Sequence, residues 1–416
     1  MPSSTPTVAV VGAGPAGLTA AIAAARRGAR VAVFEAGPAP GRKLLASGGG
    51  RCNLTNTLPV DAFMARFAGH GRFMQPALAR LGPGQLRAFL AELGVATHAP
   101  DGRRVFPTDH RARTVLDGLR AELARLQVEL HLATPVVGLD VQADRIRGVL
   151  RPDGPWPAAA VVLACGGCGY PALGGSLAGC ELAAACSHRL VAPHPGMVPL
   201  RTRESWPARC TADTVPRARL SLRRSGRRGL AAVGDLIFTR DGLAGPVVLD
   251  LAREVTPLLD AEGALTLALE LTPDDQDTWR GRLQAARAAA PARRLADWLT
   301  DEGELGRALA GVLSELAGTD PDGPLERVGQ PAMSRLAAVL ARVEVTLVGH
   351  GGWDQAMVMR GGVSLRDVRP ESLQSRRIRG LYLAGEMLDL DGPCGGFNLQ
   401  WAFASGHLAG TSAAGG

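Results

Sequence analysis

The sequence of 416 residues predicts an α/β fold, and three observations carry that prediction. An apolar strand, a glycine-rich turn, an alanine-rich helix and a second strand follow one another near the N-terminus. Two later apolar stretches, at 160–164 and 380–384, run into further glycines. Between them, roughly over 195–345, the pattern changes from alternating strands to helices. At about 150 residues per domain, the length fits a parallel-sheet domain split by an insertion.

The first strand–turn–helix–strand unit has the form of a dinucleotide-binding motif. Residues 7–11 read as a buried strand, 16–27 as a helix that closes at Gly28, and 30–34 as a second strand. The turn at 12–17 has the sequence GAGPAG, a GxGxxG motif. Its glycines permit the tight turn, the approach of a pyrophosphate and the close packing of helix on sheet. We therefore predict a Rossmann-type nucleotide-binding domain.

An acid at the end of the second strand completes the motif. Glu35 lies where a carboxylate can accept hydrogen bonds from both ribose hydroxyls and disfavour a 2′-phosphate. The helix N-terminus offers N–H groups and a partial positive charge to the phosphates. These features predict an adenine dinucleotide, but they do not separate FAD from NAD.

Two later segments favour FAD. The strand at 160–164 runs into a glycine pair, and the strand at 380–384 leads to an acidic turn at Glu386 and a helix starting near Asn398. The flavin end of FAD needs such a second site, because an acid can hold the ribityl hydroxyls. The positive end of a helix can face the flavin N1–C2=O edge, which gains negative charge on reduction.

A longer signature makes the sequence similar to a known family. Residues 41–56, GRKLLASGGGRCNLTN, resemble the signature of the YhiN/BaiN-type (HI0933-like) FAD-dependent flavoproteins, which share the glutathione-reductase-like FAD fold. The resemblance covers nearly the whole chain, since it continues in 234–239, 242–246, 361–363, 385–389 and 395–400. It implies FAD, a split nucleotide-binding domain, and an insertion with a β-rich and a helical part. One such protein reduces a carbon–carbon double bond of an oxo-steroid, a bile-acid intermediate.

The motifs and the resemblance together predict the residues that contact FAD. These are Gly12, Gly14, Pro15, Ala16, Gly17, Glu35, Ala36, Arg42, Lys43, Ser47, Gly48, Gly49, Gly50, Arg51, Cys52, Asn53, Val136, Ala164, Gly166, Gly167, Gly385, Glu386, Phe397, Asn398, Leu399 and Gln400. Two positions depart from the family pattern. Cys165 and Met359 stand where such proteins tend to have threonine, and Met359 could alter the wall of the substrate pocket.

The signature also has a direct physical interpretation. Ser47 and the three glycines after it carry almost no side chains, so we expect a flexible backbone that can approach a flat ring or a phosphate. Arg42, Lys43 and Arg51 bracket this stretch with positive charge. Lys43 is the only lysine, and we hypothesise that a compact ammonium is needed where a guanidinium does not fit. The alternative is a solvated surface loop.

Seven cysteines spread thinly over the chain predict a reducing compartment. Cys52 lacks the nearby second cysteine that a redox pair needs, so we interpret it as a small packed residue. Cys165 and Cys168 match a metal or redox spacing, yet no second pair or histidine cluster accompanies them, and no metal site is predicted. Cys394 lies beside the predicted flavin helix, where it could pack or contact substrate.

Composition limits the partners. The net charge of +7 is spread along the chain, which makes nucleic acid an unlikely partner. No stretch reaches the ~18 apolar residues that span a bilayer, and glycines and a proline interrupt the apolar N-terminus. We predict a soluble, cytoplasmic protein with no membrane partner and a small-molecule substrate; the oligomeric state does not follow from the sequence.

We divide the chain into four parts. A first part of the FAD domain covers 1–194, a β-rich insertion 195–272, a helical insertion with a return strand 273–345, and the second part of the FAD domain 346–416. Residues 264–270 read as a strand. Thr272 is the predicted N-cap of a helical stretch that reaches about Gly318, with breaks at Pro291 and near Gly303.

An arginine-rich segment precedes that strand. Residues 217–228 hold six arginines, and their alternation predicts a half-exposed strand followed by a turn. A solvated hairpin explains them, and the alternative is a docking patch for an anionic partner.

The combined features predict a reductase. Reduced FAD would pass hydride from N5 to an electron-poor double bond, with NAD(P)H as the transient donor, since no second GxGxxG with a terminal acid occurs. Lys43, Tyr170 and His194 are the candidate catalytic residues, the last two as proton donors. The expected walls of the substrate pocket are Tyr170, Pro171, Phe238, Thr239, Met359 and Phe397. The alternatives are an FAD-dependent nucleic-acid modifier or RNA-associated flavoprotein, and an FAD-binding protein without turnover.

Overall fold

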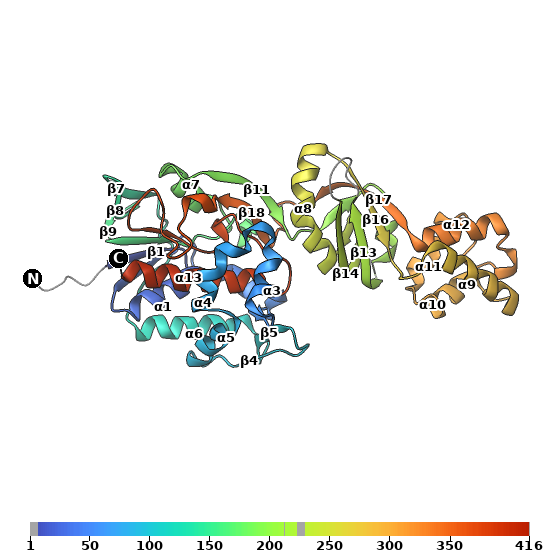
Figure 1. Cartoon of the computed structure of the whole chain (residues 1–416), viewed down its shortest axis with the longest axis horizontal. Helices are drawn as coiled ribbons and strands as arrows, with labels where there is room; N and C mark the ends of the chain where they lie inside the picture. Colours follow the sequence, from blue (N-terminus) through green and yellow to red (C-terminus); the bar gives the residue numbers. More distant parts are fainter. Residues whose placement is uncertain (1–6, 212, 223–228, 416) are drawn as a thin grey trace, which may run out of the picture. The chain divides into compact units, whose positions relative to one another are not determined.

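The computed structural model describes residues 7–211, 213–222 and 229–415 (Figure 1). The chain forms two compact units. Met1–Pro195 and Ala356–Gly416 make up one, here called the split unit, and Gly196–Gln355 make up the inserted unit. The predicted fold class is confirmed. The return to the split unit comes later than the expected boundary at 345/346, because strand β17 (Val343–His350) closes a barrel in the inserted unit.

A five-stranded parallel sheet forms the centre of the split unit, in the order β19–β10–β1–β2–β6. Its strands are β1 (Thr7–Val11), β2 (Arg30–Phe34), β6 (Glu129–His131), β10 (Ala160–Leu163) and β19 (Leu381–Leu383). Every residue of β10 and β19 is buried, as a parallel sheet with helices on its faces requires. The four strands predicted here from apolar runs are confirmed.

Two helices from opposite ends of the chain lie side by side along this sheet (Figure 1). Helix α1 (Pro15–Ala25) follows the glycine turn, and α13 (Phe397–Ala414) ends the described chain. A Cβ atom at Gly406 would lie 2.1 Å from the Ala16 carbonyl oxygen, so the two backbones touch where no side chain intervenes. The helices predicted at 16–27 and from Asn398 are therefore confirmed to within about two residues.

Smaller elements surround the sheet. The helices are α2 (Arg42–Ala46), α3 (Val60–Met64), α4 (Gln75–Arg80), α5 (Pro83–Glu92), α6 (Ala112–Arg125) and α7 (Ala178–Ala185). The strands are β3 (Thr55–Asn56), β4 (Thr97–His98), β5 (Arg104–Pro107), β7 (Gly138–Gln142), β8 (Arg145–Arg151), β9 (Gly154–Pro157), β11 (Leu190–Gly196) and β18 (Val358–Val363). Strands β11 and β18 pair with each other, and β3–β5–β4 and β7–β8–β9 form two three-stranded sheets.

The inserted unit contains a closed barrel in the order β12–β15–β14–β13–β16–β17. Its helices interrupt the barrel in sequence, between β15 and β16 and between β16 and β17. The further strands are β12 (Leu200–Thr202), β13 (Thr214–Leu222), β14 (Leu230–Thr239), β15 (Gly242–Ala244) and β16 (Leu265–Glu270). The helices are α8 (Pro246–Glu262), α9 (Gln276–Ala289), α10 (Leu295–Asp301), α11 (Arg307–Leu316) and α12 (Gln330–Ala341). The strands predicted at 264–270 and from Arg217, and the two helix breaks, are confirmed.

One predicted cap is wrong. Helix α9 begins at Gln276, and the Asp275 carboxylate accepts a hydrogen bond from Thr278 N. Thr272 does not cap it, because its hydroxyl accepts a hydrogen bond from the indole of Trp279, a fully buried side chain. The turn expected at Ser225-Gly226 lies outside the described residues.

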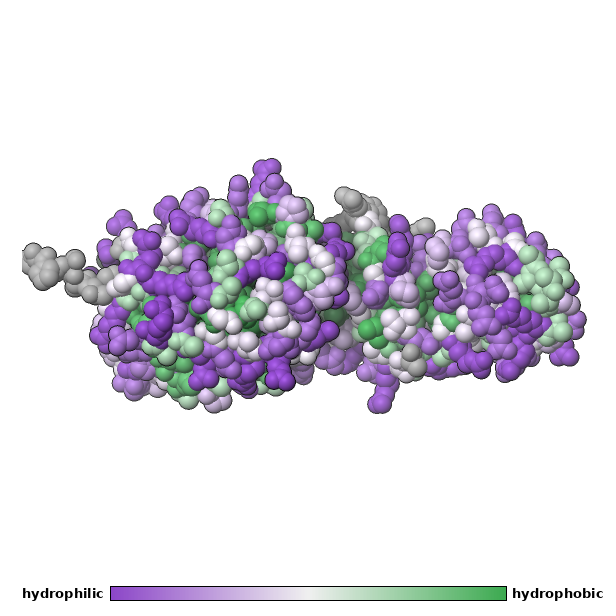
Figure 2. All heavy atoms as spheres, turned by 90° about the horizontal axis from the view of Figure 1, so that it is seen from below, coloured by the Kyte–Doolittle hydropathy of each residue, from purple (hydrophilic) through white to green (hydrophobic). Residues whose placement is uncertain are grey.

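Among the helices of the described residues, none combines the length and apolarity that crossing a membrane demands. Figure 2 shows hydrophilic residues over most of the face in view, with hydrophobic ones in scattered spots.

Candidate functional site

The glycine turn after β1 has a shape that only glycine allows at two of its three positions. Gly12 has φ of +103°, and a Cβ atom there would lie 2.5 Å from the Ala164 carbonyl oxygen at the end of β10. A Cβ atom at Gly17 would lie 1.8 Å from the Gly12 carbonyl oxygen, so α1 packs directly on the turn. Around Gly14 no atom lies within 4 Å of such a Cβ. Open space is therefore left at the N-terminus of α1, where a phosphate group is expected.

The Glu35 carboxylate is held against this turn. Its Oε2 accepts a hydrogen bond from Ala13 N, and its Oε1 accepts one from Gly37 N, both at 2.8 Å. Each carboxylate oxygen keeps a further acceptor position. The Glu35 carbonyl oxygen accepts from Thr134 N, which brings the segment before Val136 beside the exposed Ala36. The two backbone hydrogen bonds thus hold the Glu35 carboxylate in a fixed orientation.

The signature segment is a folded turn, which corrects the expectation of a flexible loop. Ser47–Gly50 form a short 3-10 segment in which Gly48 and Gly49 have left-handed φ of 58° and 66°. Cys52 N donates to Ser47 O, and the Ser47 hydroxyl donates to Leu44 O. Because these bonds fix the backbone, the exposed Gly48 and Gly49 have one defined conformation at the surface of this site.

Charged side chains of the signature have protein partners. Arg42 donates to Ala172 O at 2.6 Å, and Arg51 donates to Gly48 O while its guanidinium lies 5.8 Å from the Phe106 ring centre. Lys43 Nζ lies 2.9 Å from both oxygens of Glu386. Glu386 also accepts a hydrogen bond from Met359 N at 2.8 Å. The ammonium, the acidic turn and β18 therefore meet at one carboxylate.

A second contact joins the signature to the C-terminal glycine pair. A Cβ atom at Gly396 would lie 2.4 Å from the Thr55 carbonyl oxygen, and the Asn56 amide donates to Gly395 O at 3.0 Å. The Asn53 amide lies 3.2 Å from both Thr55 O and Gly396 N, which suits donation to the first and acceptance from the second. The N-terminus of α13 is thus fixed beside the signature.

The first turn of α13 is bound to its surroundings by its own side chains. Asn398 exchanges two hydrogen bonds with the backbone of Gly392. The Gln400 amide donates to Leu81 O, and its buried Oε1 has no hydrogen-bond partner among the described residues. Phe397 packs on Phe63 at 4.7 Å between ring centres. The expected cofactor residue Leu399 lies in this first turn, and Gly385 N donates to the Ser405 hydroxyl further along α13.

Burial disfavours the thiolate form of three cysteines near the site. Burial raises the pKa of Cys52 and of Cys165 to about 12 and that of Cys168 to about 11. The Cys165 thiol donates to Val11 O, and the Cys168 thiol contacts the Met359 sulfur at 3.6 Å. Such pKa values disfavour the thiolate that a nucleophile or a metal ligand needs.

The candidate proton donors differ in setting. Tyr170 is half-buried with φ of +55°, an uncommon conformation for an aromatic residue, at the start of the turn Pro171–Leu173. Among the described residues, none forms a hydrogen bond with its hydroxyl. His194 lies half-buried on β11, in the split unit.

Two side chains expected in a pocket wall are packed elsewhere. Phe238 is 1% exposed and packs on Trp206 inside the barrel core, because β14 points it inward. Met359 is also 1% exposed and contacts Cys168. The expectation that these two side chains line the pocket is therefore wrong.

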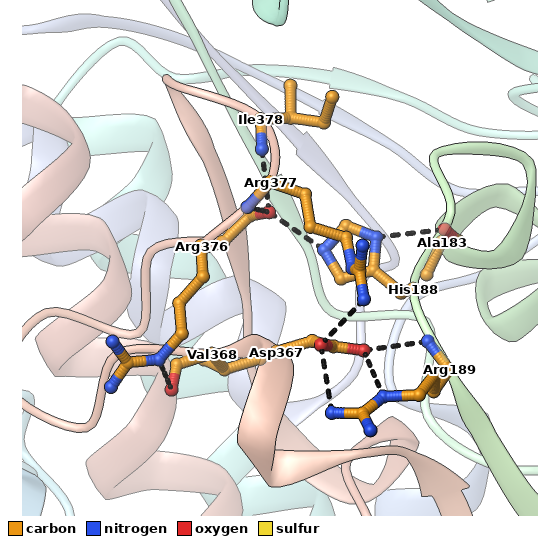
Figure 3. A network of polar contacts seen from close by, with 9 residues as sticks. Ala183, His188, Arg189, Asp367, Val368, Arg376, Arg377 and Ile378 are labelled. Atoms are coloured by element: carbon orange, nitrogen blue, oxygen red, sulfur yellow. Dashed lines mark hydrogen bonds and ion pairs between the residues drawn. The ribbon is translucent and has the colours of Figure 1, made fainter.

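Sequence reasoning missed a buried polar network at the end of α7 (Figure 3). Asp367 is 4% exposed and accepts hydrogen bonds from Arg189 N at 2.7 Å and from Arg377 Nη2 at 3.0 Å. His188 lies between Ala183 O and the Ser375 hydroxyl, at 2.9 and 2.8 Å. An acid in the arginine-rich stretch 366–377 was the available signal. The network holds the segment before β19 in place.

A family model and several known proteins match nearly the whole chain. The model of the HI0933-like protein Rossmann domain matches residues 6–412. A 3-dehydro-bile acid delta(4,6)-reductase of Clostridium scindens is 32% identical, over 98% of this chain and 98% of that protein. Ribosomal RNA dihydrouridine synthases of Haemophilus influenzae and Escherichia coli are 28% and 29% identical, over 97% and 95% of this chain and the same shares of theirs.

Solved structures share the fold. An open conformation of a flavocytochrome c3 fumarate reductase has a TM-score of 0.52 at 20% identity, over all of this chain and 79% of its own. A 3-ketosteroid delta1-dehydrogenase from Sterolibacterium denitrificans has a TM-score of 0.56 at 15% identity, over 99% of this chain and 100% of its own.

Proposed function

The chain belongs to the HI0933-like Rossmann-domain family, and we propose that it is an FAD-dependent reductase of an electron-poor carbon–carbon double bond. The family resemblance predicted from residues 41–56 is thereby confirmed. One observation carries the proposal: relatives with two different names share one kind of reaction. Both the bile acid delta(4,6)-reductase and the dihydrouridine synthases are named for saturating a double bond next to a carbonyl system.

The residues present fit FAD. The open space at Gly14 and the N-terminus of α1 would take the pyrophosphate, and the fixed Glu35 carboxylate would accept from the ribose. The flavin or the phosphates would lie close to the left-handed backbone of Gly48 and Gly49, because no side chain intervenes. The N-terminus of α13 would face the flavin end of the cofactor.

When bound, FAD supplies hydride at its N5 atom. The protein residues orient the site and move a proton. Lys43 places a positive charge beside Glu386 and orients that carboxylate toward the cofactor site. Tyr170, whose hydroxyl is uncommitted among the described residues, would donate the proton to the substrate, with His194 as the alternative donor. We propose NAD(P)H as electron donor, a small hydrophobic acceptor, and a cytoplasmic location.

A second candidate is a flavoprotein that modifies RNA, favoured by the ribosomal RNA dihydrouridine synthases at 28% and 29% identity. The described part of the arginine-rich segment adds little to this candidate. Arg219 lies 3.6 Å from Glu270, so its charge is already countered. Arg223, Arg224, Arg227 and Arg228 lie outside the described residues.

Reoxidation separates the two candidates. The FAD-loaded protein is reduced chemically without oxygen, and its visible flavin band is followed after adding a steroid enone or a uridine-containing RNA. Return of the band with the enone alone supports the small-molecule reductase. Return with RNA alone overturns it in favour of the second candidate.

A further inference from the structure

A hollow of about 370 Å³ opens in the inserted unit, at the turn between β14 and β15. Its polar lining comes from β12, from that turn and from the segment after β17, and consists of Arg201, Thr239, Arg240, Asp241 and Gln355. The proposed function gives none of these residues a role, although the sequence places Thr239 among the expected walls of the substrate pocket.

Glycines keep the space around Arg201 free. Leu200 is buried in the barrel core and Arg201 is exposed, so Arg201 points outward from the barrel. Its neighbours in register are Gly242 on β15 and Gly349 on β17, and neither has a side chain. Thr239 lies across Gly242 on the next strand. The Arg201 side chain and the Thr239 hydroxyl therefore flank a floor of bare backbone.

The two arginines of the hollow are uncommitted. No hydrogen bond or ion pair within the described residues engages the guanidinium of Arg201 or Arg240. Two other arginines of the inserted unit have partners: Arg209 pairs with Glu315 at 2.6 Å, and Arg219 pairs with Glu270. Asp241 is the one acid among the lining residues, and its carbonyl accepts from Thr202 N, which fixes the turn.

We propose that this hollow binds the carboxylate of a small organic acid, with Arg201 and Arg240 as its cationic partners. A guanidinium presents paired N–H donors that match the two oxygens of a carboxylate. Thr239 and Gln355 add further donors, and Pro199 gives an apolar wall for the adjoining carbon chain. The carboxylate site does not depend on the proposed reaction, so either can fail without the other.

Paired probes test the assignment. We would use a 3-oxo-4-ene steroid with a side-chain carboxylate, and its methyl ester, and measure both affinities for the FAD-loaded full chain by calorimetry. The wild type should bind the acid about tenfold to a hundredfold more tightly than the ester, as charge-assisted hydrogen bonds typically allow. Arg201→Gln and Arg240→Gln should each bring this ratio close to one. Arg219→Gln, an ion-paired arginine of the same barrel, should leave it unchanged.

The results separate this proposal from the reductase. An acid-to-ester ratio near one in the wild type, or a ratio that survives both hollow variants, overturns the carboxylate site. The carboxylate site is also overturned if Arg201→Gln and Arg240→Gln weaken retention on RNA and leave the acid-to-ester ratio intact. The hollow would then bind RNA phosphates. A ratio lost as expected, with neither probe reoxidising the flavin, supports the site and overturns the reductase instead.

Discussion

Lys43 Nζ lies 2.9 Å from each carboxylate oxygen of Glu386, so one ion pair joins the first and last thirds of the chain. Both side chains are partly buried, at 29% and 22% exposure. A Cβ atom built at Gly169 would lie 3.4 Å from the same Nζ, so the ammonium lies beside a residue that has no side chain. The pair therefore ties the signature to the acidic turn.

Replacing Lys43 should weaken flavin retention. Lys43→Met leaves Glu386 without its cation, and we expect a loss of about 1–2 kcal/mol in FAD binding, roughly tenfold in affinity. Lys43→Arg should also lose flavin, because the guanidinium needs more room. The ratio of flavin to protein absorbance, with added FAD, checks both. An arginine variant with full flavin content and turnover would refute the need for a compact ammonium.

Adding a side chain at Gly14 should affect the cofactor and not the fold. No atom lies within 4 Å of a Cβ there, so Gly14→Ala should change the free energy of unfolding by less than about 1 kcal/mol. FAD affinity should fall at least about tenfold, since the methyl group occupies the phosphate approach. Gly84→Ala, equally unobstructed on α5, is the control. Unchanged FAD binding in Gly14→Ala would place the pyrophosphate elsewhere.

His188 should make stability depend on pH. Burial lowers the pKa of His188 in the folded state, so the unfolded chain binds the proton more readily. Stability is then fully present above the unfolded pKa, about 6.5, and is lost as the pH falls below it. Melting temperatures from pH 8 to pH 5 should fall more steeply for wild type than for His188→Gln. Parallel curves would contradict a buried neutral imidazole.

Asp367 should contribute to stability without affecting the cofactor. Burial opposes its ionisation, but hydrogen bonds from Arg189 and Arg377 outweigh this and lower its pKa. Asp367→Asn should cost about 2–3 kcal/mol in urea unfolding and leave flavin content of the folded protein unchanged. Asp153→Asn, which breaks the pair between Arg151 and a carboxylate that is 66% exposed, should cost less than about 1 kcal/mol. Equal costs would show that the network is no stronger than a surface pair.

Short-range patterns made much of the split unit predictable. The strand at Thr7–Val11, the glycine turn and the strand at Arg30–Phe34 follow from apolar runs and from chain geometry that only glycine permits. The contacts of Lys43 with Glu386, and of Thr55 with Gly396, join residues more than 300 positions apart. No local pattern encodes such pairs; family resemblance could only suggest that these segments share a site.

Other features depended on packing. Thr272 has the sequence signs of a helix cap, yet a buried tryptophan engages its hydroxyl. The glycines of the signature predict flexibility, yet backbone hydrogen bonds at Cys52 fix them. Phe238 lies in a stretch whose alternating pattern predicts a strand. Closure of the barrel, however, decides which face of that strand is buried. In each case tertiary structure overrode a local preference.

An anaerobic titration of the purified, FAD-supplemented protein with NADPH and then NADH would show whether a pyridine nucleotide reduces the bound flavin. We expect a visible flavin band that bleaches promptly with one of these donors and returns when a steroid enone is added. A protein that shows no flavin band after FAD is supplied, or a band that neither nucleotide bleaches, would contradict an NAD(P)H-driven flavin reductase.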